Sequence, residues 1–470
     1  MPDRVTTNRP AAVVIGASAA GLFAAAALAE FADVTLVERD TLPDGPDARR
    51  GVPQAHHAHL VWSGGVKAFS ELLPGIVDEV VAAGGRLVHI MGDMVSRAPN
   101  EVWFRRFTST HHHNLVASRP LLDYVLRSRV LSDPRIKLRE NTQVVGLTGT
   151  AGVVTGVRIK ADASDERLST DFVVDASGRG SRAPQWLKEL GLPDIEMKEV
   201  NAGVAYSTRV FKAPGTTAAT AFPIINVQAN PARTPGQGGI ILPIEGDRWI
   251  VTLSGSRGGE PTSDPEAFVK FALGLGHPII GDLLKDAEPI GDIHTSRSTA
   301  NCRRYYEMSS LWPDRFAVLG DAIAAYNPVY GHGLTVAAQC ALAVRDVLRS
   351  HSLTAPGTAH RVQRAAARPV SAAWDLAVGQ DAFYPGATDT PPTAMQRALA
   401  RYIDRCVETG ATNPRALGAL LDVMSLERPP ARLFSADMLW PMVIGRRKAQ
   451  LTEPPLSHRE REAAHRWAIS

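Results

Sequence analysis

The first forty residues alternate between apolar runs and a stretch of small residues. Ala12–Gly16 is an uninterrupted apolar run, Ala19–Glu30 is rich in alanine, and Asp33–Glu38 is again mostly apolar and ends in an acid. Short apolar runs are typical of strands buried on both faces, and the longer alanine-rich stretch is typical of a helix. The pattern predicts a βαβ unit with two parallel strands, at the start of an α/β fold.

The pattern continues with helices and strands up to about residue 180. Gly64–Ala83 and Arg119–Val130 show helical periodicity, and Ser118 and Pro120 mark the start of the second helix. Val144–Ile159 is expected to form a hairpin that turns at Thr150–Gly152, and Asp171–Asp175 a short buried strand. The Pro-, Gly- and Asp-rich segment Asp40–Arg50 is expected to be a loop.

A different pattern begins near residue 200. Four strand-like segments separated by Pro- and Gly-rich turns predict an antiparallel sheet in a second domain: Gly203–Phe211, Phe222–Gln228, Gly239–Ile244 and Arg248–Ser254. Arg315–Leu319 then returns to a parallel-type strand, and Leu334–Ser350 is a long helix. From Leu353 onward the pattern is helical, with Pro-rich breaks at 391–392 and 429–430.

Composition narrows the class of protein. The 51 basic and 48 acidic residues give a net charge of +3, which offers no electrostatic reason to expect a nucleic-acid partner. Three scattered cysteines do not form a disulfide framework and favour a reducing, cytoplasmic location. Ala11–Phe31 superficially resembles a signal peptide, but it is fully explained as strand, turn and helix, and we expect no membrane span.

The first chemical motif lies between the first strand and helix. Gly16-Ala17-Ser18-Ala19-Ala20-Gly21 follows the G-x-G-x-x-G pattern, with Ser18 at the second glycine position. Such glycines permit a tight turn and close helix–strand packing, and the helix N-terminus then holds a pyrophosphate. Glu38, at the end of the second strand, is placed to bind the ribose hydroxyls of an adenosine. The motif predicts a dinucleotide site.

Two later motifs also follow apolar strands. Leu319-Gly320-Asp321-Ala322 precedes Asn327-Pro328 and Gly331-His332-Gly333, where a carboxylate can bind a ribityl chain and a helix N-terminus can face a flavin. The other motif, Asp175-Ala176-Ser177-Gly178-Arg179-Gly180-Ser181-Arg182, is a close-approach loop with two arginines for phosphate or carboxylate. Taken alone, an ordinary helix N-cap explains the first of these and a solvated loop explains the second. Together with the glycine turn they favour FAD.

The three motifs together resemble the fingerprints of the class A flavin monooxygenases, which share the para-hydroxybenzoate hydroxylase fold. Three further stretches make the chain similar to the actinobacterial polyene epoxidases of polyether pathways, such as those of monensin and lasalocid. These stretches are Arg50–His59 with Trp62–Gly65 after it, Ser256–Glu260, and Gly320–Gly333. The likeness runs from about Ala11 to Gly333 and continues loosely into the helical tail.

This resemblance implies a role for each matching residue. Glu38 would bind the adenosine ribose, Arg50 and Arg119 the phosphates, and Asp321 the ribityl chain. The flavin ring would lie against Pro328–Gly333, with Pro328, Gly331 and Gly333 facing it. The complete expected cofactor set is Gly16, Ser18, Ala19, Gly21, Glu38, Arg39, Arg50, Arg119, Asp321, Pro328, Gly331, His332 and Gly333.

The resemblance also implies the reaction. Reduced FAD and O₂ would form a C4a-hydroperoxide that delivers one oxygen atom to an alkene of a small, apolar, polyketide-like polyene in antibiotic biosynthesis. An alkene needs no deprotonation, which agrees with a sequence that shows no evident catalytic dyad. Asp175-Ala176 stands where the class has Asp-Gly, in a loop that handles nicotinamide there. The expected electron source is therefore NAD(P)H or a separate flavin reductase.

Other functions on the same scaffold stay open at this point. An aromatic hydroxylase differs only in its substrate pocket, and a [4+2] cyclase would keep FAD as a structural element. A halogenase is disfavoured because the W-x-W-x-I-P segment is absent from the sequence. A flavin-binding protein without catalytic activity is the least favoured, because the long second domain suits enclosure of a ligand.

The expected architecture is an α/β fold: a Rossmann-type (GR2-like) FAD-binding domain, an inserted, mostly antiparallel β-sheet substrate domain, and a helical C-terminal region. The FAD-binding domain is expected to use residues 10–190 and 291–350, the sheet domain 191–290, and the helical region 351–470. An apolar cleft above the flavin is expected to include Tyr206, Phe222 and Ile224. We expect no metal, because His56, His57, His59 and His111–His113 show no tetrahedral ligand spacing and no adjacent acid cluster.

Overall fold

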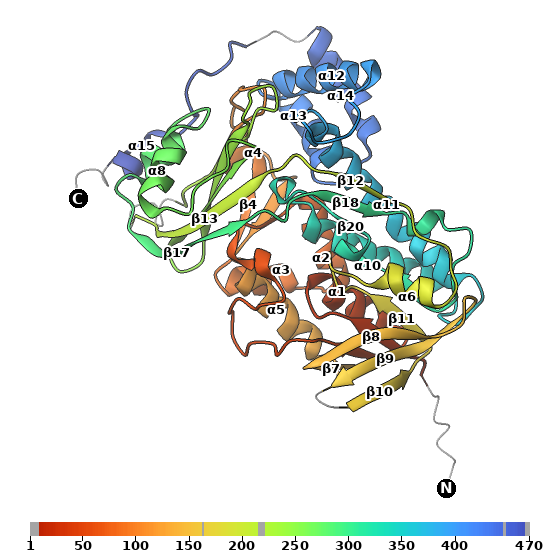
Figure 1. The fold of residues 1–470 in the computed structure, drawn as a ribbon. Helices are drawn as coiled ribbons and strands as arrows, with labels where there is room; N and C mark the ends of the chain where they lie inside the picture. The colour runs from red at the N-terminus through yellow and green to blue at the C-terminus, as the bar shows by residue number, and fades with distance from the viewer. Residues whose placement is uncertain (1–8, 162–163, 215–220, 445–447, 466–470) are drawn as a thin grey trace.

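The computed structural model describes residues 9–161, 164–214, 221–444 and 448–465. Its first layer is a five-stranded parallel sheet in the order β19-β11-β1-β2-β7 (Figure 1). The central strand β1 (Ala11–Ile15) pairs with β2 (Asp33–Val37) and β11 (Phe172–Asp175), and the edges are β7 (Ile136–Arg139) and β19 (Phe316–Val318). The edge strand β19 therefore joins this sheet only after the chain has formed the strands of a second sheet.

Helices cover one face of this sheet and a small antiparallel sheet packs on the other side. Helix α1 (Ala19–Leu28) contacts α5 (Arg119–Leu131) and α10 (Gly333–Ser350), and its alanines allow this close packing. The predicted hairpin is confirmed as β8 (Thr142–Gly149) and β9 (Val154–Ala161), and β10 (Ser164–Ser169) adds a third strand. Ser118 caps α5 by accepting from the Leu121 N–H, as the sequence indicated.

A six-stranded sheet forms the second layer, in the order β17-β13-β16-β15-β14-β5. Its strands are β5 (Met94–Arg97), β13 (Ala205–Lys212), β14 (Ile224–Val227), β15 (Gln237–Ile244), β16 (Arg248–Gly255) and β17 (Pro289–Ser296). All neighbours are antiparallel except β5, which pairs in parallel with β14. The sheet thus takes one strand from residues 94–97 and another across residue 290, beyond the segment 191–290 expected to supply it.

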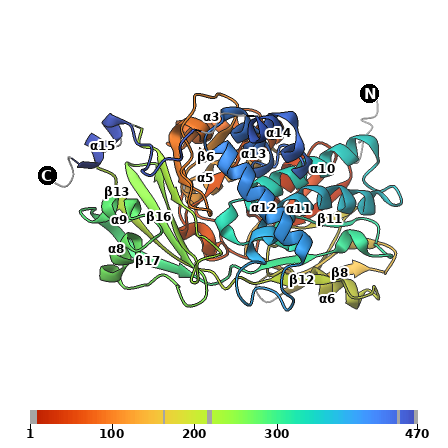
Figure 2. The ribbon, with the colours of Figure 1, turned by 90° about the horizontal axis from the view of Figure 1, so that it is seen from above.

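One face of the six-stranded sheet is covered by α8 (Pro265–Leu273) and α9 (Ile279–Leu284) around a core that contains Phe211, Trp249 and Phe268. Seen from above, this sheet lies on the left of the molecule and the parallel sheet with α10 on the right (Figure 2). Its other face packs against the C-terminal helices through a second core. That second face is where the site is built.

Smaller elements connect these layers. They include β3 (Leu60–Val61), β4 (Arg86–His89), β6 (His113–Val116), β12 (Met197–Val200), β18 (Asn301–Arg304), β20 (Ala324–Ala325), α4 (Ile90–Asp93), α6 (Ala183–Glu189), and the 3₁₀ turns η1 (Pro53–His56), η2 (Tyr306–Met308), η3 (Gly320–Ala322) and η4 (Pro328–Tyr330).

The helix predicted over Gly64–Ala83 is two helices, α2 (Ser63–Leu72) and α3 (Ile76–Ala82). Pro74 cannot continue a helix, and Gly75 at φ +87° redirects the chain.

The C-terminal region is helical, as the sequence predicts. It comprises α11 (Thr358–Asp381), α12 (Ala394–Gly410), α13 (Pro414–Met424), η5 (Pro430–Phe434), α14 (Ala436–Val443) and α15 (His458–His465). Helix α11 packs on α10 and β19, whereas α12–α14 gather above the second core (Figure 1). Within the described residues, none of the helices combines the length and apolarity needed to cross a bilayer.

Candidate functional site

The glycine turn between β1 and α1 has the geometry that the motif predicts. Gly16 lies at φ +95°, and a Cβ there would come within 2.8 Å of the Ala176 carbonyl oxygen. A Cβ on Gly21 would lie 1.7 Å from the Gly16 carbonyl oxygen, so both positions require glycine. Ser18 has an ordinary φ of −88°, and its hydroxyl accepts from Arg119 Nη2 at 3.1 Å. The second glycine of the motif is therefore dispensable in this turn.

Glu38 is buried at the end of β2, directly beside this turn. Its carboxylate accepts from the backbone N–H groups of Ala17 (2.8 Å) and Asp40 (3.1 Å) and pairs with Arg49 at 3.0 Å. Burial raises the pKa of Glu38, but the Arg49 charge and the two N–H donors outweigh burial and hold the pKa below its usual value. Glu38 is thus an ionised acceptor at the cavity wall.

A cavity of about 720 Å³ runs from this turn to the six-stranded sheet and the C-terminal helices. Most of the site residues expected from the sequence line it: Gly16, Ser18, Ala19, Glu38, Arg39, Arg119, Tyr206, Asp321, Pro328, Gly331, His332 and Gly333. Gly21 lies just behind the wall, inside α1, where it supports the turn. The fold therefore brings segments from four parts of the chain to one cavity.

Arg50 lies elsewhere. It lines a separate depression with Arg39, Asp40 and Lys160, whereas its neighbour Arg49 lines the main cavity and pairs with Glu38. The loop before η1 decides which of the two adjacent arginines faces inward. That choice depends on the path of the loop, which the sequence pattern does not show, and the role of Arg50 toward the phosphates stays a prediction.

Two of the three expected cleft residues do not line the cavity. Phe222 precedes β14 and packs against Trp249 on the far face of the sheet, with ring centroids 5.2 Å apart. Ile224 is on the near face but is buried in the second core beneath the cavity. The sheet residues that do line the cavity are Met94, Ser96, Tyr206, Asn226, Val227, Gly239, Ile240, Leu242, Thr252, Ser254, Gly255 and Ser296. Ile224 and Asn226 share one face of β14, so position along the strand, which the sequence pattern left open, decides which of them reaches the cavity.

The loop after β19 forms the floor of the cavity. Asp321 lies in η3, and burial raises its pKa against the opposing charges of Arg179 and Arg119. Gly331 is in the left-handed region at φ +66°, next to Trp62, whose Nε1 donates to the Tyr330 carbonyl at 2.9 Å. These contacts fix the backbone that leads into α10.

His332 ends this loop and is almost fully buried. Its Nε2 bonds the Met424 carbonyl oxygen at 2.9 Å, which makes Nε2 the protonated nitrogen of a neutral ring. Burial lowers the pKa of His332 to about 4. Its Nδ1 is a buried acceptor without a hydrogen-bond partner among the described residues. The loop thus carries an unsatisfied acceptor at the cavity.

A buried carboxylate on α11, which sequence reasoning missed, holds the same loop. Asp381 accepts from the Tyr330 hydroxyl (2.6 Å) and from the side-chain amides of Asn327 (2.9 Å) and Asn301 (2.7 Å). The Tyr206 hydroxyl donates to Asn327 Oδ1 at 2.6 Å and joins the sheet to this network. Burial raises the pKa of Asp381, and the three hydrogen bonds oppose that rise. No local motif around residue 381 marks it in the sequence.

The Arg50–His59 stretch also contributes to the cavity wall. His57 Nδ1 bonds Thr208 Oγ1 at 2.8 Å, and that hydroxyl bonds Thr252 Oγ1 at 2.7 Å. Burial is the main cause that lowers the pKa of His57 to about 4 and that of His59 to about 3. Both histidines are therefore neutral groups: His57 ties the loop to the sheet, and His59 bonds the His57 carbonyl within the loop at 2.8 Å.

Comparison with known proteins shows which family has this arrangement of residues. Residues 9–373 match the sequence profile of a family described as the FAD binding domain. The chain belongs to that family. Rv3254 from Mycobacterium tuberculosis (strain ATCC 25618 / H37Rv) is 29% identical over 426 residues, which cover 88% of this chain and 89% of Rv3254. With the match to the family, the predicted Rossmann-type fold class is confirmed.

Two solved structures share the fold. The p-nitrophenol 4-monooxygenase PnpA from Pseudomonas putida DLL-E4 superposes with a TM-score of 0.62 at 12% identity, covering 88% of this chain and 98% of PnpA. The Diels-Alderase PyrE3 of the pyrroindomycin pathway gives 0.57 at 14% identity, covering 88% of this chain and 80% of PyrE3. At these identities the likeness shows the fold and no shared activity.

The cavity of this FAD-binding-domain protein fits the cofactor. Helix α1 has no side-chain cap and no acid in its first turn, so its N-terminal N–H groups are free to bind phosphate oxygens. Helix α10 begins in the same way after His332, at the floor of the cavity, where a flavin edge gains negative charge on reduction. The glycine turn, Glu38 and the two helix ends therefore suit a flavin adenine dinucleotide.

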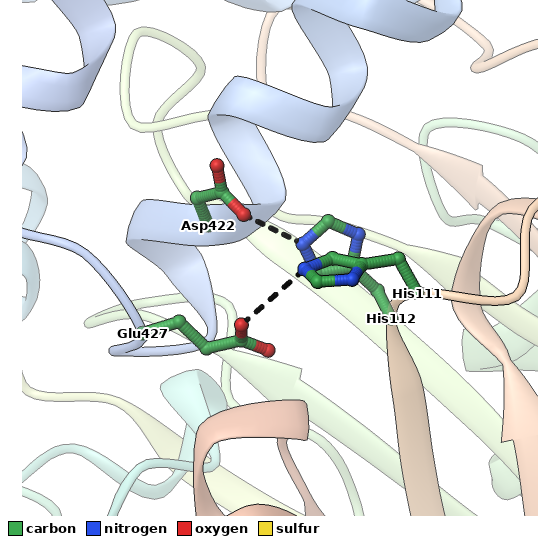
Figure 3. Close-up of side chains that lie close together, drawn as sticks. All are labelled: His111, His112, Asp422 and Glu427. Atoms are coloured by element: carbon green, nitrogen blue, oxygen red, sulfur yellow. Dashed lines mark hydrogen bonds and ion pairs between the residues drawn. The ribbon is translucent and has the colours of Figure 1, made fainter.

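Two of the histidines that the sequence pattern excluded as metal ligands lie next to acidic residues. His111 and His112 lie beside Asp422 and Glu427 from the end of α13 (Figure 3). The expectation that no acid cluster stands next to them is wrong, because the acids are more than 300 residues away in the sequence. His56, in contrast, stacks on His294 with ring centroids 3.9 Å apart.

Proposed function

We propose that this protein is an FAD-dependent monooxygenase that epoxidises an alkene in a polyketide-like polyene of secondary metabolism. The observation that carries the proposal is the apolar lobe of the cavity, which adjoins the loop 328–333. We define this lobe by the residues that α4, the sheet, the segment between β5 and β6, and helices α12–α13 contribute: Ile90, Met91, Met94, Phe104, Ile240, Leu242, Ile403, Val407, Leu417, Leu420, Leu421 and Met424. An extended hydrocarbon chain suits such a lining.

In this proposal the chain's own residues bind and orient the two reactants. Glu38 accepts hydrogen bonds from the adenosine ribose, and Arg49 and Arg119 neutralise the phosphates at the end of α1. Asp321 binds the ribityl chain, and Pro328–Gly333 holds the flavin ring against the lobe. When bound and reduced, FAD supplies the electrons that activate O₂, and one oxygen atom goes to the alkene while the other leaves as water.

The protonation states of the cavity histidines support an alkene over a phenol. Removal of a phenolic proton requires a base poised near neutral pH. His57, His59 and His332 are neutral, but burial makes each a weak base with a pKa of about 4 or below. An alkene requires only alignment and exclusion of water, which packing provides.

One polar feature of the lobe suggests how a substrate is oriented. Arg105 follows Phe104 and lines the cavity, and its backbone N–H donates to the Ala411 carbonyl at the end of α12 (2.9 Å). Its Nη2 donates to the Ala449 carbonyl at 2.9 Å, whereas its Nε is buried without a hydrogen-bond partner among the described residues. We infer that Arg105 binds a carboxylate at one end of the polyene.

A cyclase that keeps FAD idle is the second candidate, because PyrE3 carries a Diels-Alderase activity on this fold. The deciding experiment supplies reduced FAD, ¹⁸O₂ and a linear polyene acid, with an external reductase as the electron source. The proposal predicts a product that gains one labelled oxygen and keeps all its hydrogens. An unlabelled isomer of unchanged mass, formed equally well without O₂, would establish the cyclase. A labelled phenol from an aromatic substrate, with the polyene untouched, would instead establish a hydroxylase.

A further inference from the structure

The four residues of the histidine–acid cluster come from two distant segments. His111 and His112 precede β6, Asp422 lies on α13, and Glu427 lies in the turn that follows α13. His112 Nε2 lies 2.9 Å from Asp422 Oδ1, and His111 Nε2 lies 3.6 Å from Glu427 Oε2 (Figure 3). The ligand atoms of all four residues lie within 4.8 Å of one another. The fold thus converges two imidazoles and two carboxylates on one point.

These spacings approach those of a tetrahedral metal site. Zinc binds imidazole nitrogen and carboxylate oxygen at about 2.0–2.2 Å, which places neighbouring ligand atoms about 3.4 Å apart. The His112–Asp422 and His111–Glu427 separations, 2.9 and 3.6 Å, lie on either side of that value, and every other separation is at most 4.8 Å. The cluster also holds buried atoms that lack a partner among the described residues, namely Glu427 Oε1 and His112 Nδ1. A carboxylate oxygen that is buried without a partner is costly, and a cation would satisfy it.

We propose that His111, His112, Asp422 and Glu427 bind a divalent transition-metal ion of the zinc type. Imidazole and carboxylate ligands suit zinc better than calcium or magnesium, which take oxygen ligands. His111 is 62% exposed and provides the entry path for the ion, whereas the side chains of His112 and Glu427 are more than nine-tenths buried. This site is separate from the flavin chemistry and does not depend on the proposed monooxygenase function.

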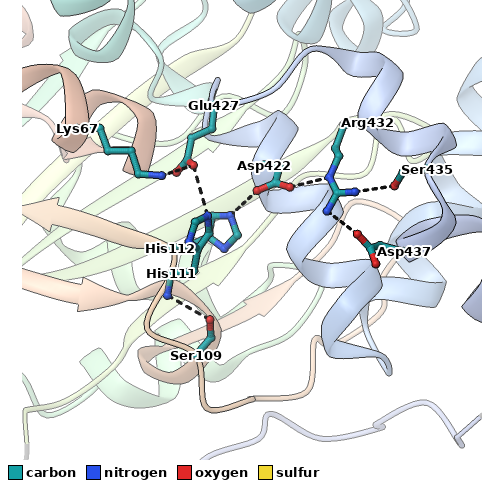
Figure 4. Close-up of polar contacts among 9 residues, drawn as sticks. All are labelled: Lys67, Ser109, His111, His112, Asp422, Glu427, Arg432, Ser435 and Asp437. Carbon is teal, nitrogen blue, oxygen red and sulfur yellow. Dashed lines mark hydrogen bonds and ion pairs between the residues drawn. The ribbon is translucent and has the colours of Figure 1, made fainter.

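Two cationic side chains, Lys67 and Arg432, already pair with the carboxylates of the cluster and would compete with a metal for them. Lys67 pairs with Glu427 Oε2, and Arg432 pairs with Asp422 Oδ2 at 2.7 Å while it also binds Asp437 at 2.8 Å (Figure 4). Arg432 bonds the oxygen of Asp422 that faces away from His112, so it can stay as an outer partner of the site. Lys67 is 54% exposed and bonds the oxygen near His111, so it must move when a metal binds.

The structural role of such an ion follows from what α13 contacts. Leu417, Leu420 and Leu421 on α13 line the apolar lobe, and the Met424 carbonyl receives the hydrogen bond from His332. The turn after α13 also binds the main structure, because the Ser425 carbonyl accepts from the Gly64 N–H at 3.1 Å. A metal that joins this turn to the segment before β6 would fix one wall of the cavity. It would stabilise the folded state without touching the reacting atoms.

The test is zinc titration of the full-length, tag-free protein, with FAD bound and after treatment with a chelator. We expect one zinc ion per chain by calorimetry and by metal analysis after dialysis, and a higher melting temperature with zinc. His111→Ala and Glu427→Gln should each weaken binding about tenfold or more, whereas His351→Ala, at an exposed histidine outside the cluster, should bind like the wild type. Lys67→Met should bind zinc more tightly, because the competing ammonium is gone.

Three outcomes would overturn the proposal. The first is a wild-type protein that takes up no zinc in the micromolar range, because the cluster would then be only an ion-pair network. The second is uptake that His111→Ala and Glu427→Gln leave unchanged, which would place the ion elsewhere. The third is a Lys67→Met variant that binds zinc no more tightly than the wild type, because the ammonium would then not compete with a metal for Glu427. His111 is exposed, so its variant tests binding without risk to the fold.

Discussion

Replacement of Asp381 by alanine should destabilise the protein through the loop that forms the cavity floor. The substitution removes the acceptor of the Tyr330 hydroxyl, of the Asn327 amide and of one N–H of the Asn301 amide, which keeps only its longer bond to the Val200 carbonyl at 3.4 Å. Each hydrogen bond to a charged group contributes about 1.5–3 kcal/mol. The total loss is smaller than the sum of three such bonds, because the bonds are coupled and because removal of the carboxylate also removes the cost of burying it. We therefore expect a loss of about 3–5 kcal/mol in the free energy of unfolding, as for other broken buried networks.

Asp381→Asn distinguishes the hydrogen bonds from simple packing. The amide keeps the shape of the side chain, yet it presents one acceptor oxygen where the carboxylate presented two. It can satisfy Tyr330 or the two asparagine amides but not all three donors, so we expect a loss of about 1–3 kcal/mol. Asp375→Ala, at an exposed position of the same helix, is the matched control and should change stability by less than about 0.5 kcal/mol.

Urea unfolding of the wild type and the three variants, with and without FAD, measures these differences. FAD binding should also weaken in Asp381→Ala, because the loop 327–333 would lose its anchor. Equal unfolding midpoints for Asp381→Ala and the wild type would refute the reasoning. An Asp381→Asn variant as unstable as Asp381→Ala would also refute it, because the loss would then not follow the count of unsatisfied donors.

Four further predictions concern the same site. Glu38→Gln should weaken FAD binding about tenfold or more in a fluorescence titration, because a charged acceptor is lost; unchanged affinity would remove Glu38 from the cofactor site. Gly21→Ala should lower the melting temperature and FAD content, because its Cβ would lie 1.7 Å from the Gly16 carbonyl oxygen, while Ser18→Gly should be nearly neutral. Because the pKa of His332 is about 4 in the folded state and 6.5 otherwise, the folded protein should lose up to about 3 kcal/mol as pH falls from 6.5 to 4, and His332→Gln should flatten that dependence. Arg105→Met should raise KM for a polyene acid about tenfold while KM for its methyl ester stays constant, and equal effects on both would argue against a carboxylate anchor.

The sequence predicts much of the framework because local pattern decides it. The strand–helix–strand beginning, the capped helix at Arg119, the hairpin at 142–161 and most strands of the second sheet follow from periodicity and turn residues. The glycine turn was predictable in detail, because backbone geometry at Gly16 and Gly21 excludes any side chain. The break at Pro74 was also readable from the sequence, but the helical pattern on both sides obscured it.

The tertiary structure decided which side chains meet. The path of the loop turned Arg49 into the cavity and Arg50 away from it, and position along β14 placed Asn226 on the wall and Ile224, on the same face, in the core beneath it. Asp381, the last residue of the 24-residue helix α11, contacts Asn327 in the loop before η4. Asp422 contacts His112, which lies 310 positions away in the sequence. Periodicity and turn chemistry act over a few residues, so the sequence by itself determined the elements and the glycine motif. Contacts between distant segments depend on how those elements pack, so only the folded chain determined the buried carboxylate, the apolar lobe and the histidine–acid cluster.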